Sequence, residues 1–321
     1  MTAALPRSVA ILAAIGASIG LLACGEEARE NIEVLRPNLI EENPENSGVR
    51  LTIGSKNFTE QFVLAEIYAQ ALKAAGYDVA KRLDLGSERV ALRALRDGTI
   101  DAYPEYTSTA LTSLFGVPAA DVPSEAGQAY EAALPELDER GLVALPPTPF
   151  SSANAVGLLT EHAEQLGVSA ISELGDDAPQ LTLAGSPECR TRADCLVGLE
   201  DEYGLEFGRF REVPISRRYE VLETAGAELS ILFTTDPQLF VSDNYVILED
   251  DLGALPPGNV LFVVRKDAAD EAGEDLGEVV ERVQSELSLE RMQELNARVD
   301  IGGETPTQVA RSYLEEFGFV R

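Results

Sequence analysis

Alternating apolar and polar positions divide the chain into short strands and amphipathic helices that follow one another in a regular order. The first half of the pattern predicts strands at 51–53, 77–85 and 100–103, with helices at 58–75 and 87–96 between them. A second series predicts helices at 125–140, 193–203 and 216–225, and strands at 142–145, 155–159, 181–184 and 229–233. After a strand at 260–264 the chain is helical to its end. Because this alternation produces a largely parallel sheet with helices on both faces, we expect the α/β class, in two lobes.

Polar residues follow directly after several of these strands. Ligands of open α/β sheets gather outside the carboxyl ends of the strands. At the first such end, Gly54 turns the chain toward a helix, and Lys56 adds a positive charge beside the N–H groups of the helix start. We therefore expect an anion-sized site there, and Asn57 with Glu60 predicts a capping box. Taken alone, the segment also fits an ordinary turn with a surface lysine.

The amino end predicts a secretion signal. An uncharged run at 8–23 follows Arg7 and is too short to span a bilayer comfortably. Its end, from Leu21 to Cys24, resembles a bacterial lipobox, which implies a lipoprotein signal peptide at 1–23, cleavage before Cys24 and acylation of the Cys24 sulfur. We expect an extracytoplasmic protein anchored by this lipid to a bacterial membrane, at the cell surface or in the periplasm. A plain signal peptide with an incidental cysteine is the alternative.

Composition separates a linker from the folded part and excludes some partners. Residues 24–48 are acidic and rich in Asn and Pro, which predicts a flexible linker. The chain has 55 Asp and Glu against 25 Lys and Arg, a net charge of −30. Such a charge argues against nucleic acid or anionic lipid as a partner.

Two cysteines remain besides Cys24. Cys189 and Cys195 stand six positions apart, and in an oxidising compartment we expect them to form a disulfide. A metal site at these cysteines would lack further ligands, because the only histidine, His162, stands in the segment Thr-Glu-His-Ala, which has the form of a helix start, and is expected at the solvated surface. We therefore predict no metal and no cofactor.

Enzyme motifs are missing from the sequence. Outside the predicted signal peptide at 1–23 there is no G-x-S-x-G, and the whole sequence has no H-E-x-x-H, no glycine-rich phosphate loop and no second histidine for a triad. We expect a binding protein and not an enzyme. A hydrolase that uses two carboxylates stays open, as does calcium binding at the acidic run 249–251, which is more typical of a solvated face.

Several separate motifs occur in a fixed order over the folded part. They are 53–61, 101–109, 218–220, 233–236 and 246–251. Together they resemble the substrate-binding proteins of ABC importers for glycine betaine, choline, carnitine and related quaternary amines. The resemblance implies a two-lobed periplasmic-binding-protein fold of type II, with a ligand cleft between lobes that close like a hinge. It also implies a discontinuous lobe 1, at 49–153 plus 240–321, with lobe 2 at 154–239.

The resemblance implies a cage of aromatic rings around the ligand. A trimethylammonium group has no N–H to donate and is held best by the negative faces of rings. Tyr106 and Tyr219 match two cage tyrosines of the family, and Phe233 stands where a third ring is common. A fourth family tyrosine is replaced here by Asn154, so the cage has lost one ring.

The polar end of the ligand has its own expected partners. By the same resemblance, a betaine carboxylate is held by Lys56, with Asn57 beside it, by the Thr109 hydroxyl and by Arg192. The disulfide would fix the loop that carries Arg192. The resemblance implies a monomeric receptor that delivers a zwitterionic or cationic amine, an osmoprotectant, to an ABC permease. A receptor for another small zwitterion or for a bulkier aromatic or amine ligand, or a sensory lipoprotein, stays open.

Overall fold

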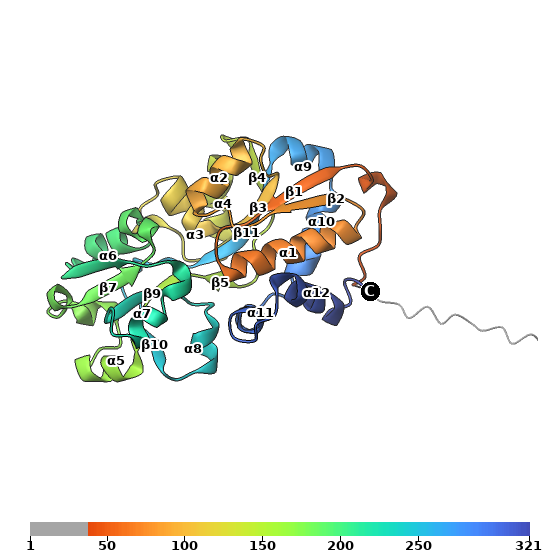
Figure 1. The fold of residues 1–321 in the computed structure, drawn as a ribbon. Coiled ribbons are helices and arrows are strands. Elements are labelled where there is room, and N and C mark those ends of the chain that lie inside the picture. Colours follow the sequence, from red (N-terminus) through yellow and green to blue (C-terminus); the bar gives the residue numbers. More distant parts are fainter. Residues whose placement is uncertain (1–37) are drawn as a thin grey trace, which may run out of the picture. The chain divides into compact units, whose positions relative to one another are not determined.

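A computed structural model describes residues 38–321. The expected signal peptide, Cys24 and the linker up to residue 37 lie outside the described residues. Within 38–321 no helix is long and apolar enough to cross a membrane. The described residues form two sheets, each covered by its own helices (Figure 1).

The first sheet has the strand order β2-β1-β3-β11-β4, and β5 pairs with β11. Strands β1, β2 and β3 are parallel, and β11 runs antiparallel between β3 and β4. The strands are β1 Arg50–Gly54, β2 Asp78–Arg82, β3 Ala102–Tyr106, β4 Leu142–Ala144, β5 Ser151–Ser152 and β11 Gly258–Arg265.

Helices cover both faces of this sheet. On one face α1 packs against the sheet and α12 packs beside α1, and α2 and α4 cover the other face (Figure 1). The alternation of β11 explains this burial, since Phe262 enters one core and Leu261 and Val263 enter the other. The helices are α1 Thr59–Ala74, α2 Glu88–Arg96, α3 Thr107–Thr109, α4 Ala126–Asp138, α9 Lys266–Ala272, α10 Asp275–Gln284, α11 Leu289–Asp300 and α12 Pro306–Glu316.

The second sheet has the order β10-β6-β9-β7-β8. It comprises β6 Asn154–Leu159, β7 Thr182–Gly185, β8 Arg209–Glu212, β9 Leu229–Phe233 and β10 Tyr245–Ile247. Its helices are α5 Thr160–Leu166, α6 Leu196–Tyr203, α7 Glu220–Glu223 and α8 Pro237–Val241. The expected α/β class is confirmed. Strands β8 and β10 are absent from the sequence prediction, and the helix expected at 216–225 is the short α7 preceded by a 3-10 turn.

The boundary expected between residues 239 and 240 is displaced. After β9 the chain touches the first lobe, where the Asn296 amide donates to the Thr235 carbonyl at 3.2 Å. It then returns to the second sheet, where β10 pairs antiparallel with β6, and Leu248 and Leu255 enter the second lobe's core. Residues 245–255 therefore belong to lobe 2, and the chain returns to lobe 1 just before β11.

The carboxyl end of the expected flexible linker is folded. Residues 44–46 form a 3-10 turn, and the buried Asn46 donates from its side chain to the Ala75 carbonyl at 2.8 Å. Ile40 is also buried, and its N–H donates to the Phe319 carbonyl at 2.8 Å. The expectation of a flexible segment is wrong for 38–48, because these contacts fix it against lobe 1.

Candidate functional site

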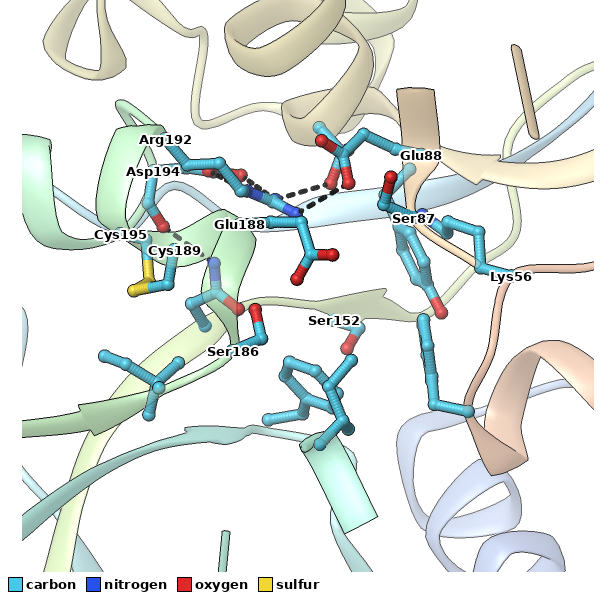
Figure 2. A pocket seen from close by; sticks show the side chains of 18 of the residues that line it. Lys56, Ser87, Glu88, Ser152, Ser186, Glu188, Cys189, Arg192, Asp194 and Cys195 are labelled. Carbon is cyan, nitrogen blue, oxygen red and sulfur yellow. Dashed lines mark hydrogen bonds and ion pairs between the residues drawn. A yellow bond between two sulfur atoms is a disulfide. The ribbon is translucent and has the colours of Figure 1, made fainter. Parts of the chain in front are cut away.

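A cavity lies where the strand ends of the two sheets face each other (Figure 2). The space between its lining atoms, counted to its open mouth, is about 870 Å³. Seven of the eight residues expected to bind ligand line it: Lys56, Asn57, Tyr106, Thr109, Asn154, Arg192 and Phe233. Both lobes contribute, so the cavity lies between them.

Lys56 follows β1 and is almost completely buried. Its ammonium forms an ion pair with the buried Glu105 carboxylate and lies 4.5 Å from the centroid of the Tyr106 ring. The Lys56 charge is therefore not free for a bound anion as expected, because the Glu105 carboxylate from β3 already neutralises it.

The expected capping box does not form. The N-cap of α1 is Phe58, without a side-chain capping bond. Glu60 is buried instead and accepts hydrogen bonds from the Tyr106 hydroxyl at 2.6 Å and from the Asn296 amide at 3.1 Å. Burial raises the pKa of the Glu60 carboxyl above its ordinary value. The hydrogen bond to Glu60 thus fixes the position of the Tyr106 ring.

Phe58, Tyr106 and Phe233 form a group of rings at the cavity. The Phe58 ring lies 6.3 Å from Tyr106 and 5.3 Å from Phe233, centroid to centroid. Protein cations already lie over two of these rings, with Lys56 above Tyr106 and the Arg218 guanidinium 4.7 Å from the centroid of Phe233. From the sequence, Phe58 is expected only as the first residue of the helix at 58–75, and its place in the cavity was missed.

Tyr219 does not line the cavity. It is buried, its hydroxyl donates to Asp236 at 3.0 Å, and its ring packs edge-on against Tyr245. Asp236 in turn pairs with Arg218, which does line the cavity. The Tyr219 ring therefore lies beside Arg218 and outside the lining of this cavity, and its expected cage role stays a prediction.

Arg192 lies inside a closed loop. The Cys189 and Cys195 sulfurs are joined in a disulfide, with their Cα atoms 5.2 Å apart. Arg192 donates from Nε to Asp194 at 2.7 Å and from Nη2 to the Thr109 hydroxyl at 3.2 Å. Although burial opposes its charge, the nearby Asp194 and Glu88 carboxylates raise the pKa of Arg192 above its ordinary value. The guanidinium is therefore permanently charged.

Asn154 begins β6 at the crossing between the lobes. Its side-chain amide donates to the Asp194 carbonyl at 2.7 Å, so it fixes the strand to the disulfide loop. The structure thus gives Asn154 a structural partner as well as a place in the cavity lining.

Carboxylates make up a part of the lining that the sequence analysis missed. They are Glu88, Glu188 and Asp194. Glu88 lies just after the end of the strand predicted at 77–85, and Glu188 and Asp194 lie in the segment with the two cysteines. Their positions could therefore have indicated a place in the site. Their acidic character could not, because the chain has 55 Asp and Glu. A cavity with rings, cations and carboxylates suits a small organic ion.

A cavity of this kind between two α/β lobes defines a solute-binding protein of the periplasmic type, with the type II fold. The model of the family described as substrate binding domain of ABC-type glycine betaine transport system matches residues 49–316. The chain belongs to this family, which is a component of transporters and not a family of enzymes.

Individual relatives agree with this assignment. The chain is 34% identical over 278 residues to the glycine-betaine-binding protein of Pseudomonas aeruginosa, covering 83% of this chain and 87% of that protein. It is 27% identical to the ergothioneine transport permease/ergothioneine binding protein EgtU of Helicobacter pylori, over 88% of this chain, and spans 49% of that longer protein. A solved structure of a glycine betaine/carnitine/choline ABC transporter protein has a TM-score of 0.66 at 21% identity, over 83% of this chain and 98% of that one.

Proposed function

We propose that this protein captures a small quaternary amine or betaine-like osmoprotectant between its lobes and delivers it to an ABC permease. The family membership supports transport, and the name of the Pseudomonas aeruginosa relative supports a betaine-like ligand. The observation that carries the proposal is the group of Phe58, Tyr106 and Phe233 rings in a cavity that also holds charged groups.

The rings receive the alkylated ammonium. Each ring face contributes about 0.5 to 2 kcal/mol to holding a desolvated cation. Of the three rings, Phe58 has its protein cation farthest away, since Lys56 is 5.8 Å from its centroid. A ligand ammonium at Phe58 would share the ring group with Lys56 and Arg218.

The polar end of the ligand lies toward the disulfide loop. Thr109 and Arg192 face each other there, and Asn154 lies beside them. Lys56 and Asn57 close the other side. A ligand carboxylate at Arg192 would replace a contact that Asp194 or Glu88 now makes.

Closure of the lobes accompanies capture. The chain crosses between the lobes around Ala153 and again just before β11, and the Thr234–Asp236 segment lies against α11. Such segments absorb hinge rotation. Arg192 from lobe 2 meets Thr109 and Glu88 of lobe 1, so these contacts form as the cleft closes.

The protein acts outside the cytoplasm as a monomeric binder without catalysis or cofactor, held to a membrane by lipid on Cys24. The lipobox supports this anchor. Acyl chains add ~0.8 kcal/mol per buried CH₂, and a multiply acylated cysteine holds the protein to the membrane without a spanning helix.

Cys24→Ser tests this anchor and should release the protein from membranes. A variant that is still cut at the same place and still bound to membranes would refute acylation.

A thermal-shift panel tests the ligand class. A ligand at 100 times its dissociation constant adds about 2.7 kcal/mol to the free energy of unfolding. We expect glycine betaine, choline, carnitine or proline betaine to raise the melting temperature, and glucose and glutamate to leave it unchanged. No shift with any alkylated amine would refute the proposal.

A bulkier alkylated amine is the second candidate. The Helicobacter pylori relative is named for ergothioneine, and Asn154 replaces a ring by a smaller amide. Ergothioneine in the same panel tests this candidate, because only a ligand that fits the enlarged space should shift the melting temperature more than glycine betaine does.

A further inference from the structure

Each cation that lines the cavity already has a carboxylate partner. Lys56 pairs with Glu105. Arg218 pairs with Asp236. Arg192 pairs with Asp194 at 2.5 Å and lies 3.6 Å from Glu88. No positive charge of the described lining is therefore left for the carboxylate of a ligand.

Glu188 differs from the other charged groups of the lining. It lies on the 3-10 turn Pro187–Thr191, beside Cys189 of the disulfide. Figure 2 shows its carboxylate pointing into the open middle of the cavity. Among residues 38–321 its side chain has neither a hydrogen bond nor an ion pair, and it is half-buried.

The charges of the site leave a negative excess. Three cations, Lys56, Arg192 and Arg218, stand against five carboxylates, which are Glu88, Glu105, Glu188, Asp194 and Asp236. When the lobes close, a carboxylate without a partner loses water, which costs free energy unless a ligand charge or donor replaces that water. The group that needs such a partner is Glu188.

We propose that Glu188 is a specificity-determining residue, which makes the cleft favour a cationic ammonium ligand with a hydroxyl or N–H donor over a zwitterion with a carboxylate. The ammonium lies against the rings, and the donor end points to the Glu188 carboxylate. A betaine carboxylate would instead meet Glu188 as a like charge and would have to displace Asp194 or Glu88 from Arg192. This inference rests on the proposed function and narrows its ligand class.

Calorimetric titrations with choline and with glycine betaine test the inference. The two probes share the trimethylammonium head and differ in a hydroxyl against a carboxylate. The variant is Glu188→Gln, which keeps the size of the side chain and removes its charge. The matched control is Glu206→Gln, which makes the same charge change at an exposed residue of lobe 2 outside the cavity.

We expect the unaltered protein to bind choline more tightly than glycine betaine. Glu188→Gln should weaken choline binding about tenfold or more and leave glycine betaine binding unchanged or tighter, and Glu206→Gln should change neither. Equal effects of Glu188→Gln on both ligands, or tighter binding of glycine betaine by the unaltered protein, would overturn the inference and leave the proposed function standing. Failure of both probes and of every other alkylated amine to bind would overturn both.

Discussion

Arg192 of lobe 2 donates from Nη2 to the hydroxyl of Thr109 in lobe 1, at 3.2 Å across the cavity. This bond joins the two lobes at the place where the polar end of a ligand would lie. The guanidinium makes it while also holding Asp194 and approaching Glu88. The Arg192 side chain therefore both joins the two lobes and lies where it can contact the ligand.

Arg192→Lys keeps the charge but loses the planar set of donors that holds Asp194 and Thr109 together. We expect the affinity for the best ligand to fall about tenfold or more, a loss of ~1.4 kcal/mol for each factor of ten. Arg190→Lys is the matched control, because Arg190 lies in the same disulfide loop but is exposed and pairs with Glu212. Titration calorimetry measures both; equal affinities in the two variants would contradict this role of Arg192.

Replacement of both Cys189 and Cys195 by Ser tests the disulfide loop. Closing so short a loop restrains the unfolded chain by roughly 2 to 3 kcal/mol in the entropy model, so urea denaturation should show a loss of that order. Ligand affinity should fall as well, because the loop with Arg192 must then be ordered on binding. Two free thiols in the unaltered protein by mass spectrometry, or an unchanged affinity in the variant, would refute this account.

Substitutions of the aromatic residues should differ in how much they weaken ligand binding. Phe58→Ala and Tyr106→Ala should each weaken ligand binding by roughly 1 to 2 kcal/mol, because each removes a ring face and admits water. Tyr219→Phe, which loses only the bond to Asp236, should change affinity little. Calorimetry on the three variants decides, and a larger loss for Tyr219→Phe than for Phe58→Ala would restore Tyr219 to the cage.

Glu60 predicts a dependence of stability on pH. Its folded pKa is raised above the ordinary value of 4.5 by burial, so the folded state holds this proton more tightly than the unfolded state does. The contribution of Glu60 is fully present below the ordinary pKa and is lost as pH rises through the raised one. Glu60→Gln should flatten this fall between the two pKa values. Urea denaturation at several pH values measures the free energy of unfolding of both proteins. The same dependence on pH in the two would contradict a raised pKa of Glu60.

The sequence predicted those elements well whose own residues show how they are buried. Strand β11 has five consecutive apolar residues and no charge from Val260 to Val264, which marks a strand buried on both faces, and the structure buries both faces of it. Strands β8 and β10 were missed, because Arg209–Glu212 is largely charged and Tyr245–Ile247 has only three residues. Such strands are defined by their neighbours in the sheet.

The site shows the same limit. Motifs placed Lys56, Tyr106, Thr109 and Arg192 at the cavity, because strand ends meet there. Tyr219 was expected there too and lies outside the lining, since packing decides on which side of Arg218 its ring lies. Pairing cannot be predicted from the sequence, so the ion pair of Lys56 with Glu105, and the lack of a partner for Glu188 among residues 38–321, could be found only in three dimensions.

The position proposed for the ligand is tested most directly by a crystal structure of the protein grown with choline. We expect the trimethylammonium nitrogen within about 6 Å of the ring centroids of Phe58 and Tyr106, with the hydroxyl toward Glu188. Choline bound elsewhere, or a cavity without choline at concentrations that saturate binding in solution, would contradict it.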